Sequence, residues 1–167
     1  MGTSLAWPPS GTNRLRMPRP LDVSDGTYLA EVARVTVDAN TGTVQLQHVD
    51  AAIDCGLVVN PDGARCQIEG SIVMQGTSST LKEEIRFAGG KVLNSSFAEY
   101  GPARSLEVPS VDVVFVEDRT LAPGGIGEPA VGGVSAAVSN AIYDAVGVRI
   151  RDLPFRPDRV LKALQGD

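Results

Sequence analysis

The sequence predicts an α+β domain, in which two main helices pack on a mixed or antiparallel sheet built from hairpins. Three observations support this fold class. Two β-branched runs flank a turn rich in Asp, Asn and Gly, two later segments repeat apolar residues at helical spacing, and a short apolar run lies between those segments. A chain of 167 residues is long enough for one domain with its own core.

The composition excludes several classes of protein. A net charge of −5 argues against nucleic-acid binding. No apolar run is long enough to span a bilayer, and the N-terminus does not resemble a signal peptide. We therefore expect a cytoplasmic protein, periplasmic only if an exported partner carries it. Cys55 and Cys66 are too few to hold an iron–sulfur cluster or a structural zinc; two buried thiols are favoured, and a disulfide stays open.

The first elements follow from local patterns. Residues 1–25 are rich in Pro, Gly, Ser and Arg without periodicity, so we expect an irregular arm, or disorder, before a domain over residues 26–167. The runs 28–38 and 42–54 form a hairpin. His48, the only histidine, is expected on the face of Leu46, where it is interpreted as a packed, hydrogen-bonded residue rather than a ligand.

A helix is predicted to start after this hairpin. Asn60 is a typical N-cap and Pro61 suits the first helical position. Ala64, Ile68 and Ile72 then recur at helical spacing, which gives the helix one apolar face.

The second half of the chain repeats these signals. Residues 83–97 predict another hairpin, turning at two consecutive glycines, and residues 111–118 predict a strand buried on both faces. In the last main helix Val134 and Val138 mark an apolar stripe, and Gly147 supplies the C-terminal stop.

A single carboxylate, Glu128, stands between Gly127 and Pro129 just before this helix. The letters GIGEPA match a dinucleotide-binding pattern, but the carboxylate would repel a pyrophosphate and Pro129 removes an amide that the phosphate needs. Two interpretations stay open. In the structural one, Glu128 lies favourably near the positive end of the helix dipole. In the catalytic one, the glycines leave room for a cofactor, and partial desolvation raises the pKa of Glu128 toward that of a general base.

Two segments carry a resemblance to a known family. The C-terminal end of the molybdenum-cofactor subunit in the xanthine dehydrogenase/aldehyde oxidase superfamily is similar to GGIGEP followed by SAAVSNAIYDAVGVRIRDLPFRPDRV. A second segment, VDAAIDCGLVVNPDGARCQIEGSIVMQG, also resembles this family. Its sequence is most similar to the large subunits of isoquinoline 1-oxidoreductase-like enzymes. The similarity covers nearly everything after about residue 26. It implies the C-terminal portion of a molybdopterin-cofactor-binding domain.

The resemblance also implies roles for particular residues. Members of the family hydroxylate a heteroaromatic ring carbon or an aldehyde, with water as the oxygen source. Glu128 corresponds to their general base, which deprotonates a metal-bound hydroxide, and Gly127 to the residue that lets the cofactor approach. Gln67 corresponds to a contact with the pterin or its dinucleotide tail, with a helix-face hydrogen bond as an equal alternative. No metal ligand is expected from the chain itself.

The family's subunit is much longer, and its other cofactor loops are not found in these residues. The resemblance therefore implies molybdopterin, in the cytosine dinucleotide form, shared with a partner chain and not held by this chain alone. A larger molybdenum-cofactor subunit and a 2Fe-2S subunit would complete the enzyme, and this chain would be inactive by itself. The alternative is a non-catalytic remnant or assembly module that keeps the fold. Both interpretations expect exposed surface and self-association.

Overall fold

The computed structural model describes residues 2–5, 26–82, 84–116 and 118–166. Its main sheet has the strand order β1-β2-β3-β6, in which the neighbours along β1, β2 and β3 are antiparallel and β6 runs parallel to β3. The strands of this sheet are β1 (Gly2–Leu5), β2 (Tyr28–Val37), β3 (Val44–Asp54) and β6 (Ser110–Phe115). The predicted α+β class with a mixed sheet is confirmed.

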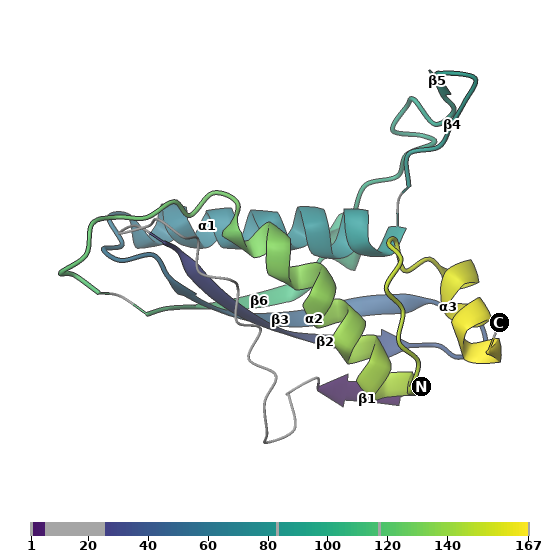
Figure 1. Cartoon of the computed structure of the whole chain (residues 1–167), viewed down its shortest axis with the longest axis horizontal. Helices are drawn as coiled ribbons and strands as arrows, with labels where there is room; N and C mark the ends of the chain where they lie inside the picture. The colour runs from purple at the N-terminus through teal and green to yellow at the C-terminus, as the bar shows by residue number, and fades with distance from the viewer. Residues whose placement is uncertain (1, 6–25, 83, 117, 167) are drawn as a thin grey trace.

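Three long helical segments lie over one face of this sheet (Figure 1). They are α1 (Pro61–Ser71), the π-helix η1 (Ile72–Lys82) that continues it, and α2 (Pro129–Val146). The core lies between them and the sheet, where Ile68, Val134 and Val49 are fully buried. A shorter helix, α3 (Pro157–Gln165), follows at the C-terminal end. Within the described residues, no helix has the length and apolar character that a bilayer span requires.

The start of α1 has the predicted cap. The side-chain oxygen of Asn60 accepts a hydrogen bond from the backbone N–H of Gly63 at 3.0 Å, and Pro61 occupies the first helical turn. Ile68 and Ile72 are both buried, so the apolar stripe faces the core as expected. The end of α2 is also as predicted. Gly147 follows the last helical residue with a φ of 76° and ends the helix.

The helix does not stop at the end of α1, and the π-helical geometry of η1 was not indicated by the sequence. π-helices are rare and are often found near functional sites. The polar residues of η1 contact α2 through one hydroxyl: Thr80 Oγ1 lies 2.6 Å from Ser135 Oγ, and Gln75 donates to the same oxygen at 3.1 Å. Two of the polar side chains of this segment, Gln75 and Thr80, are therefore accommodated by hydrogen bonds between the two helices.

The hairpin of β2 and β3 forms as predicted, but it contains a β-bulge. Arg34 pairs with His48, whereas the next residue of β2 pairs with Leu46, which leaves Gln47 without an opposite residue. Leu46 and Val49 are consequently both buried, and His48 lies on the opposite face. The expected placement of His48 on the face of Leu46 is wrong, because strict alternation does not anticipate an extra residue.

Two further expectations need correction. Part of the N-terminal arm, Gly2–Leu5, is not irregular but adds strand β1 to the edge of β2, while residues 6–25 lie outside the described residues. The strand β6 is not buried on both faces, since only Val113 of its six residues is fully buried and Val114 is exposed. As an edge strand covered by helices on one side, β6 has one solvent-facing side.

The second predicted hairpin forms from β4 (Phe87–Ala88) and β5 (Lys91–Val92), with positive φ at both glycines of its turn. It projects away from the sheet in Figure 1 and is followed by a short 3₁₀ helix, η2 (Ser105–Glu107). The cysteines also differ from expectation: Cys55 is buried as predicted, but Cys66 is exposed on α1, and no disulfide joins them.

Candidate functional site

The loop before α2 is anchored to the sheet at two points. The backbone N–H of Gly124 donates a hydrogen bond of 2.7 Å to the carbonyl of Cys55, which follows the end of β3. The hydroxyl of Thr27, just before β2, donates to the carbonyl of Gly125 at 2.6 Å. Both contacts lie a few residues before Glu128, so the sheet fixes the position of the loop that carries this carboxylate.

A third anchor connects the loop to helix α1. The hydroxyl of Ser71, the last residue of α1, donates to the carbonyl of Gly127 at 3.2 Å. Ser71 was not identified from the sequence. The sequence pattern that could have identified Ser71 is its position four residues after Gln67, on the same side of the helix.

Glu128 occupies the N-cap position of α2, and Pro129 follows as the first helical residue. Its side chain makes no capping hydrogen bond and is exposed. The capping role that most polar residues fulfil at this position is therefore absent, although the dipole of α2 still favours a negative charge there. The partial desolvation expected from the neighbouring glycine and proline is not provided by the described residues.

Gly127 has open space where a side chain would be. A β-carbon built there meets no atom within 4 Å, and its φ lies outside the left-handed region. Neither the backbone conformation nor packing among the described residues requires a glycine at this position. The free space beside Glu128 agrees with the expectation that another molecule approaches the loop.

Gln67 is exposed on α1, one helical turn before Ser71. Ser71 contacts Gly127, and the four-residue spacing places Gln67 on the same side of α1 as Ser71. The alternative expected for Gln67, a hydrogen bond along the helix face, is not found among the described residues. The structure thus places Gly127 and Glu128 on a loop that is hydrogen-bonded to the end of α1, and Gln67 one turn earlier on the same helix.

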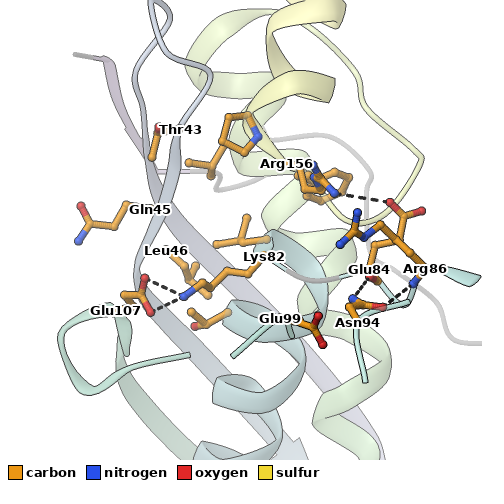
Figure 2. Close-up of a pocket in the computed structure, with 15 residues that line it drawn as sticks. Thr43, Gln45, Leu46, Lys82, Glu84, Arg86, Asn94, Glu99, Glu107 and Arg156 are labelled. Atoms are coloured by element: carbon orange, nitrogen blue, oxygen red, sulfur yellow. Dashed lines mark hydrogen bonds and ion pairs between the residues drawn. The ribbon is translucent and has the colours of Figure 1, made fainter. Parts of the chain in front are cut away.

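A cavity of about 660 Å³ opens elsewhere, at the junction of β3, η1 and the start of α3 (Figure 2). Several of its charged residues are paired: Lys82 lies 2.6 Å from Glu107, and Glu84 lies 2.9 Å from Arg159, which is outside the lining. The lining comprises Thr43, Val44, Gln45, Leu46, Thr77, Leu81, Lys82, Glu84, Arg86, Asn94, Glu99, Glu107, Phe155, Arg156 and Pro157. None of the three candidate residues belongs to it, so the cavity and the loop are separate features.

Comparison with known proteins identifies the fold and the loop. Residues 19–109, more than half of the chain, match the family model described as the molybdopterin cofactor-binding domain. The chain belongs to the family of molybdenum-binding subunits of xanthine dehydrogenases and aldehyde oxidases. The resemblance found in the sequence is thereby confirmed.

Curated relatives of the family are longer than this chain. The membrane-bound aldehyde dehydrogenase (pyrroloquinoline-quinone) of Gluconacetobacter polyoxogenes is 41% identical over 134 residues, which cover 80% of this chain and 17% of that protein. A nicotinate dehydrogenase subunit of Pseudomonas putida is 39% identical over 140 residues, which cover 84% of this chain and 12% of that protein. An isoquinoline 1-oxidoreductase subunit of Brevundimonas diminuta is 34% identical over 131 residues, covering 78% and 16%. The chain spans less than a fifth of each of these relatives.

Solved structures of molybdenum-binding family members share the fold. Quinoline 2-oxidoreductase from Pseudomonas putida 86 matches with a TM-score of 0.72 and 30% identity, over 80% of this chain and 18% of that chain. Aldehyde oxidoreductase from Desulfovibrio gigas matches with a TM-score of 0.74 and 30% identity, over 83% and 15%. The family model ends at residue 109, but the 140-residue match is long enough that position 128 must fall inside it. The Glu128 loop therefore belongs to the part that aligns with relatives.

Proposed function

We propose that this chain is part of a molybdenum hydroxylase that oxidises an N-heteroaromatic compound or an aldehyde, with water as the oxygen source. The names of its relatives support this substrate class, since they include a nicotinate dehydrogenase, an isoquinoline oxidoreductase and an aldehyde oxidoreductase. The observation that carries the proposal is the state of Glu128, which is exposed, uncapped and next to open space at Gly127. A carboxylate without a structural partner is available for chemistry.

The residues around the loop fit a molybdopterin cofactor. Gly127 leaves room for a bulky group, and the exposed carboxamide of Gln67 can donate and accept hydrogen bonds with a pterin or with the nucleotide of a cytosine dinucleotide form. When bound, the cofactor accepts the two electrons that oxidation removes from the substrate. The two cysteines of this chain cannot hold an iron–sulfur cluster, so a 2Fe-2S subunit is the expected next electron carrier.

Glu128 acts in this proposal as the general base. One oxygen of its carboxylate accepts the proton that water loses as its oxygen is transferred to the substrate carbon. A base in this role works best where bulk water is excluded. Because Glu128 is exposed among the described residues, the proposal assigns its cover to the larger part of the molybdenum-cofactor subunit. The chain is therefore expected to be inactive alone.

The first test is purification of the tagged chain from its native host, with molybdenum and pterin measured on the material that co-purifies. A larger partner with near-stoichiometric molybdenum supports the proposal. In that complex Glu128→Gln should lower the rate about 10²–10⁴-fold, the usual contribution of a general base, while molybdenum content stays unchanged. Glu99→Gln is the matched control, since Glu99 is an exposed glutamate bound only to Ser96. Equal rates for the two variants would refute the role of Glu128.

A second candidate is supported by the exposed apolar side chains near the projecting hairpin. Phe87 is 74% exposed, Phe97 83% and Leu106 95%. Exposed apolar residues gathered in one segment are typical of an interaction surface. If the chain purifies without a molybdenum-containing partner and self-associates in sedimentation velocity, a non-catalytic interaction module becomes the better description.

A further inference from the structure

A separate cluster of reactive side chains lies on the face of the sheet that α1, η1 and α2 do not cover. His48 and Asp50 belong to β3, and Asp112 belongs to the parallel strand β6. The strand register pairs His48 with Ser110 and Asp50 with Asp112. Because side chains alternate along a strand, all four point to this same face. The cluster is therefore built from neighbouring positions of two paired strands.

The distances within the cluster suit a metal ion. His48 Nε2 lies 3.1 Å from Asp50 Oδ1 and 3.7 Å from Asp112 Oδ2. One ligand atom from each of the three residues lies within 4.8 Å of the others. In a tetrahedral site with bonds of about 2.0–2.1 Å, adjacent ligand atoms are about 3.3–3.4 Å apart. The two observed distances from His48 Nε2 lie on either side of this value.

The hydrogen bond between His48 and Ser110 bears on which ring nitrogen of His48 carries a lone pair. The hydroxyl of Ser110 lies within hydrogen-bond distance of the carbonyl of Gln47, at 3.2 Å, and when it donates there its hydrogen is not available to His48. At 2.7 Å from Ser110 Oγ, the Nδ1 atom of His48 is then the donor. In the neutral ring Nε2 consequently carries the lone pair. A histidine oriented by a hydrogen bond at its other nitrogen is the usual arrangement around bound metals.

This arrangement brings together three electron-rich groups. Nε2 of His48, which carries a lone pair in the tautomer that donates from Nδ1, and the two carboxylates converge, and carboxylates directly opposite on paired strands repel each other. The bulge at Gln47 is what turns His48 to this face, and bulges commonly re-aim a side chain near a functional site. Arg34 of β2 pairs with His48. Its positive charge limits the repulsion between the carboxylates, but it does not replace a cation held by three ligands.

We propose that His48, Asp50 and Asp112 bind one divalent transition-metal ion of the zinc type. Imidazole is a favourable ligand for zinc, whereas magnesium and calcium take oxygen ligands. Three protein ligands leave a fourth position for water. The site is independent of the function proposed for Glu128, because that loop is tied to α1 and to the residue after β3.

The test uses tag-free, metal-stripped protein carrying Cys66→Ser, because the exposed Cys66 thiol could itself bind zinc. Zinc is titrated in competition with a chromophoric chelator. One equivalent should bind, and His48→Gln and Asp112→Asn should each weaken binding about tenfold or more. Asp152→Asn removes an exposed carboxylate elsewhere and should leave binding unchanged.

Nuclear magnetic resonance gives a second readout, because the only histidine yields a single set of imidazole signals. One equivalent of zinc should shift these signals, and a tenfold excess of magnesium should not. Ser110→Ala keeps all three ligands but should weaken zinc binding about 10–100-fold, the usual cost of losing such an orienting hydrogen bond. Zinc binding that survives His48→Gln, or imidazole signals that zinc does not shift, would overturn the proposal.

Discussion

The hydroxyl of Ser71 and the carbonyl of Gly127, 3.2 Å apart, connect the end of α1 to the loop that carries Glu128. This hydrogen bond holds the helix that carries Gln67 against the loop that carries Glu128. Two motifs more than fifty residues apart in the sequence thus form one candidate site. The bond is also a contact that can be removed without touching any residue proposed to meet cofactor or substrate.

Ser71→Ala should destabilise the chain by about 0.5–1.5 kcal/mol, because it removes one hydrogen bond and leaves a carbonyl with less pairing. Urea unfolding measures the change, and amide exchange should become faster at residues 124–128. Ser79→Ala is a matched control on the same helical run, since the hydroxyl of Ser79 makes only a 3.5 Å contact with Met74. If both variants are equally stable, the hydrogen bond between Ser71 and Gly127 does not contribute to the free energy of unfolding.

The two helix N-termini should respond differently to mutation. Asn60 caps α1 with a hydrogen bond to Gly63, whereas Glu128 caps nothing. We expect Asn60→Ala to cost about 1 kcal/mol of folding free energy and Glu128→Ala less than about 0.5 kcal/mol. Thermal and urea unfolding of both variants test this difference. A cost at Glu128 as large as that at Asn60 would favour the structural interpretation of this carboxylate.

Local rules predicted those parts of the fold that depend on neighbouring residues. The cap at Asn60, the stop at Gly147 and the turn at Gly89-Gly90 each depend on the conformational preference of one or two residues. Glu128 was also located correctly before α2, because proline and glycine mark helix starts and loops reliably.

Features that depend on tertiary contacts could not be predicted. The bulge at Gln47 changes the facing of His48 only because β2 pairs with β3 in a shifted register. The π-helix η1 packs on α2, where Ser135, sixty residues away in the sequence, accepts a hydrogen bond from Gln75. The exposure of Glu128 likewise depends on which distant parts of the fold pack near its loop, and local sequence contains no information on that.

Gly76 and Gly70 form a second matched pair. A β-carbon at Gly76 would lie 2.9 Å from Val134 and 3.0 Å from Leu46, whereas one at Gly70 meets no atom within 4 Å. Gly76→Ala should therefore destabilise by about 1–3 kcal/mol through overpacking, and Gly70→Ala should stabilise by about 0.5–1 kcal/mol through helix propensity. Opposite shifts of the urea midpoint are expected. Shifts of the same sign would show that η1 packs less closely on α2 than these distances indicate.

A buried carboxyl group on β2 makes stability depend on pH. Both side-chain oxygens of Glu31 are buried, neither has a hydrogen-bond partner among the described residues, and Gly133 of α2 lies against Oε2. Burial raises the pKa of Glu31 from its ordinary value of 4.5 to about 8. The folded chain therefore keeps this proton to higher pH than the unfolded chain does.

Between pH 4.5 and 8 the folded state holds a proton on Glu31 that the unfolded state has already released, so raising the pH favours unfolding. Stability should fall by up to about 1.4 kcal/mol per pH unit in this window and level off above pH 8. Glu31→Gln cannot ionise, so its stability advantage over the wild type should grow as pH rises from 5.5 to 8. Urea unfolding at four pH values measures this difference, and comparing the two proteins cancels the titration of every other group. Glu69→Gln should run parallel to the wild type. Parallel curves for Glu31→Gln would mean that the Glu31 carboxyl finds water or a partner in the folded chain.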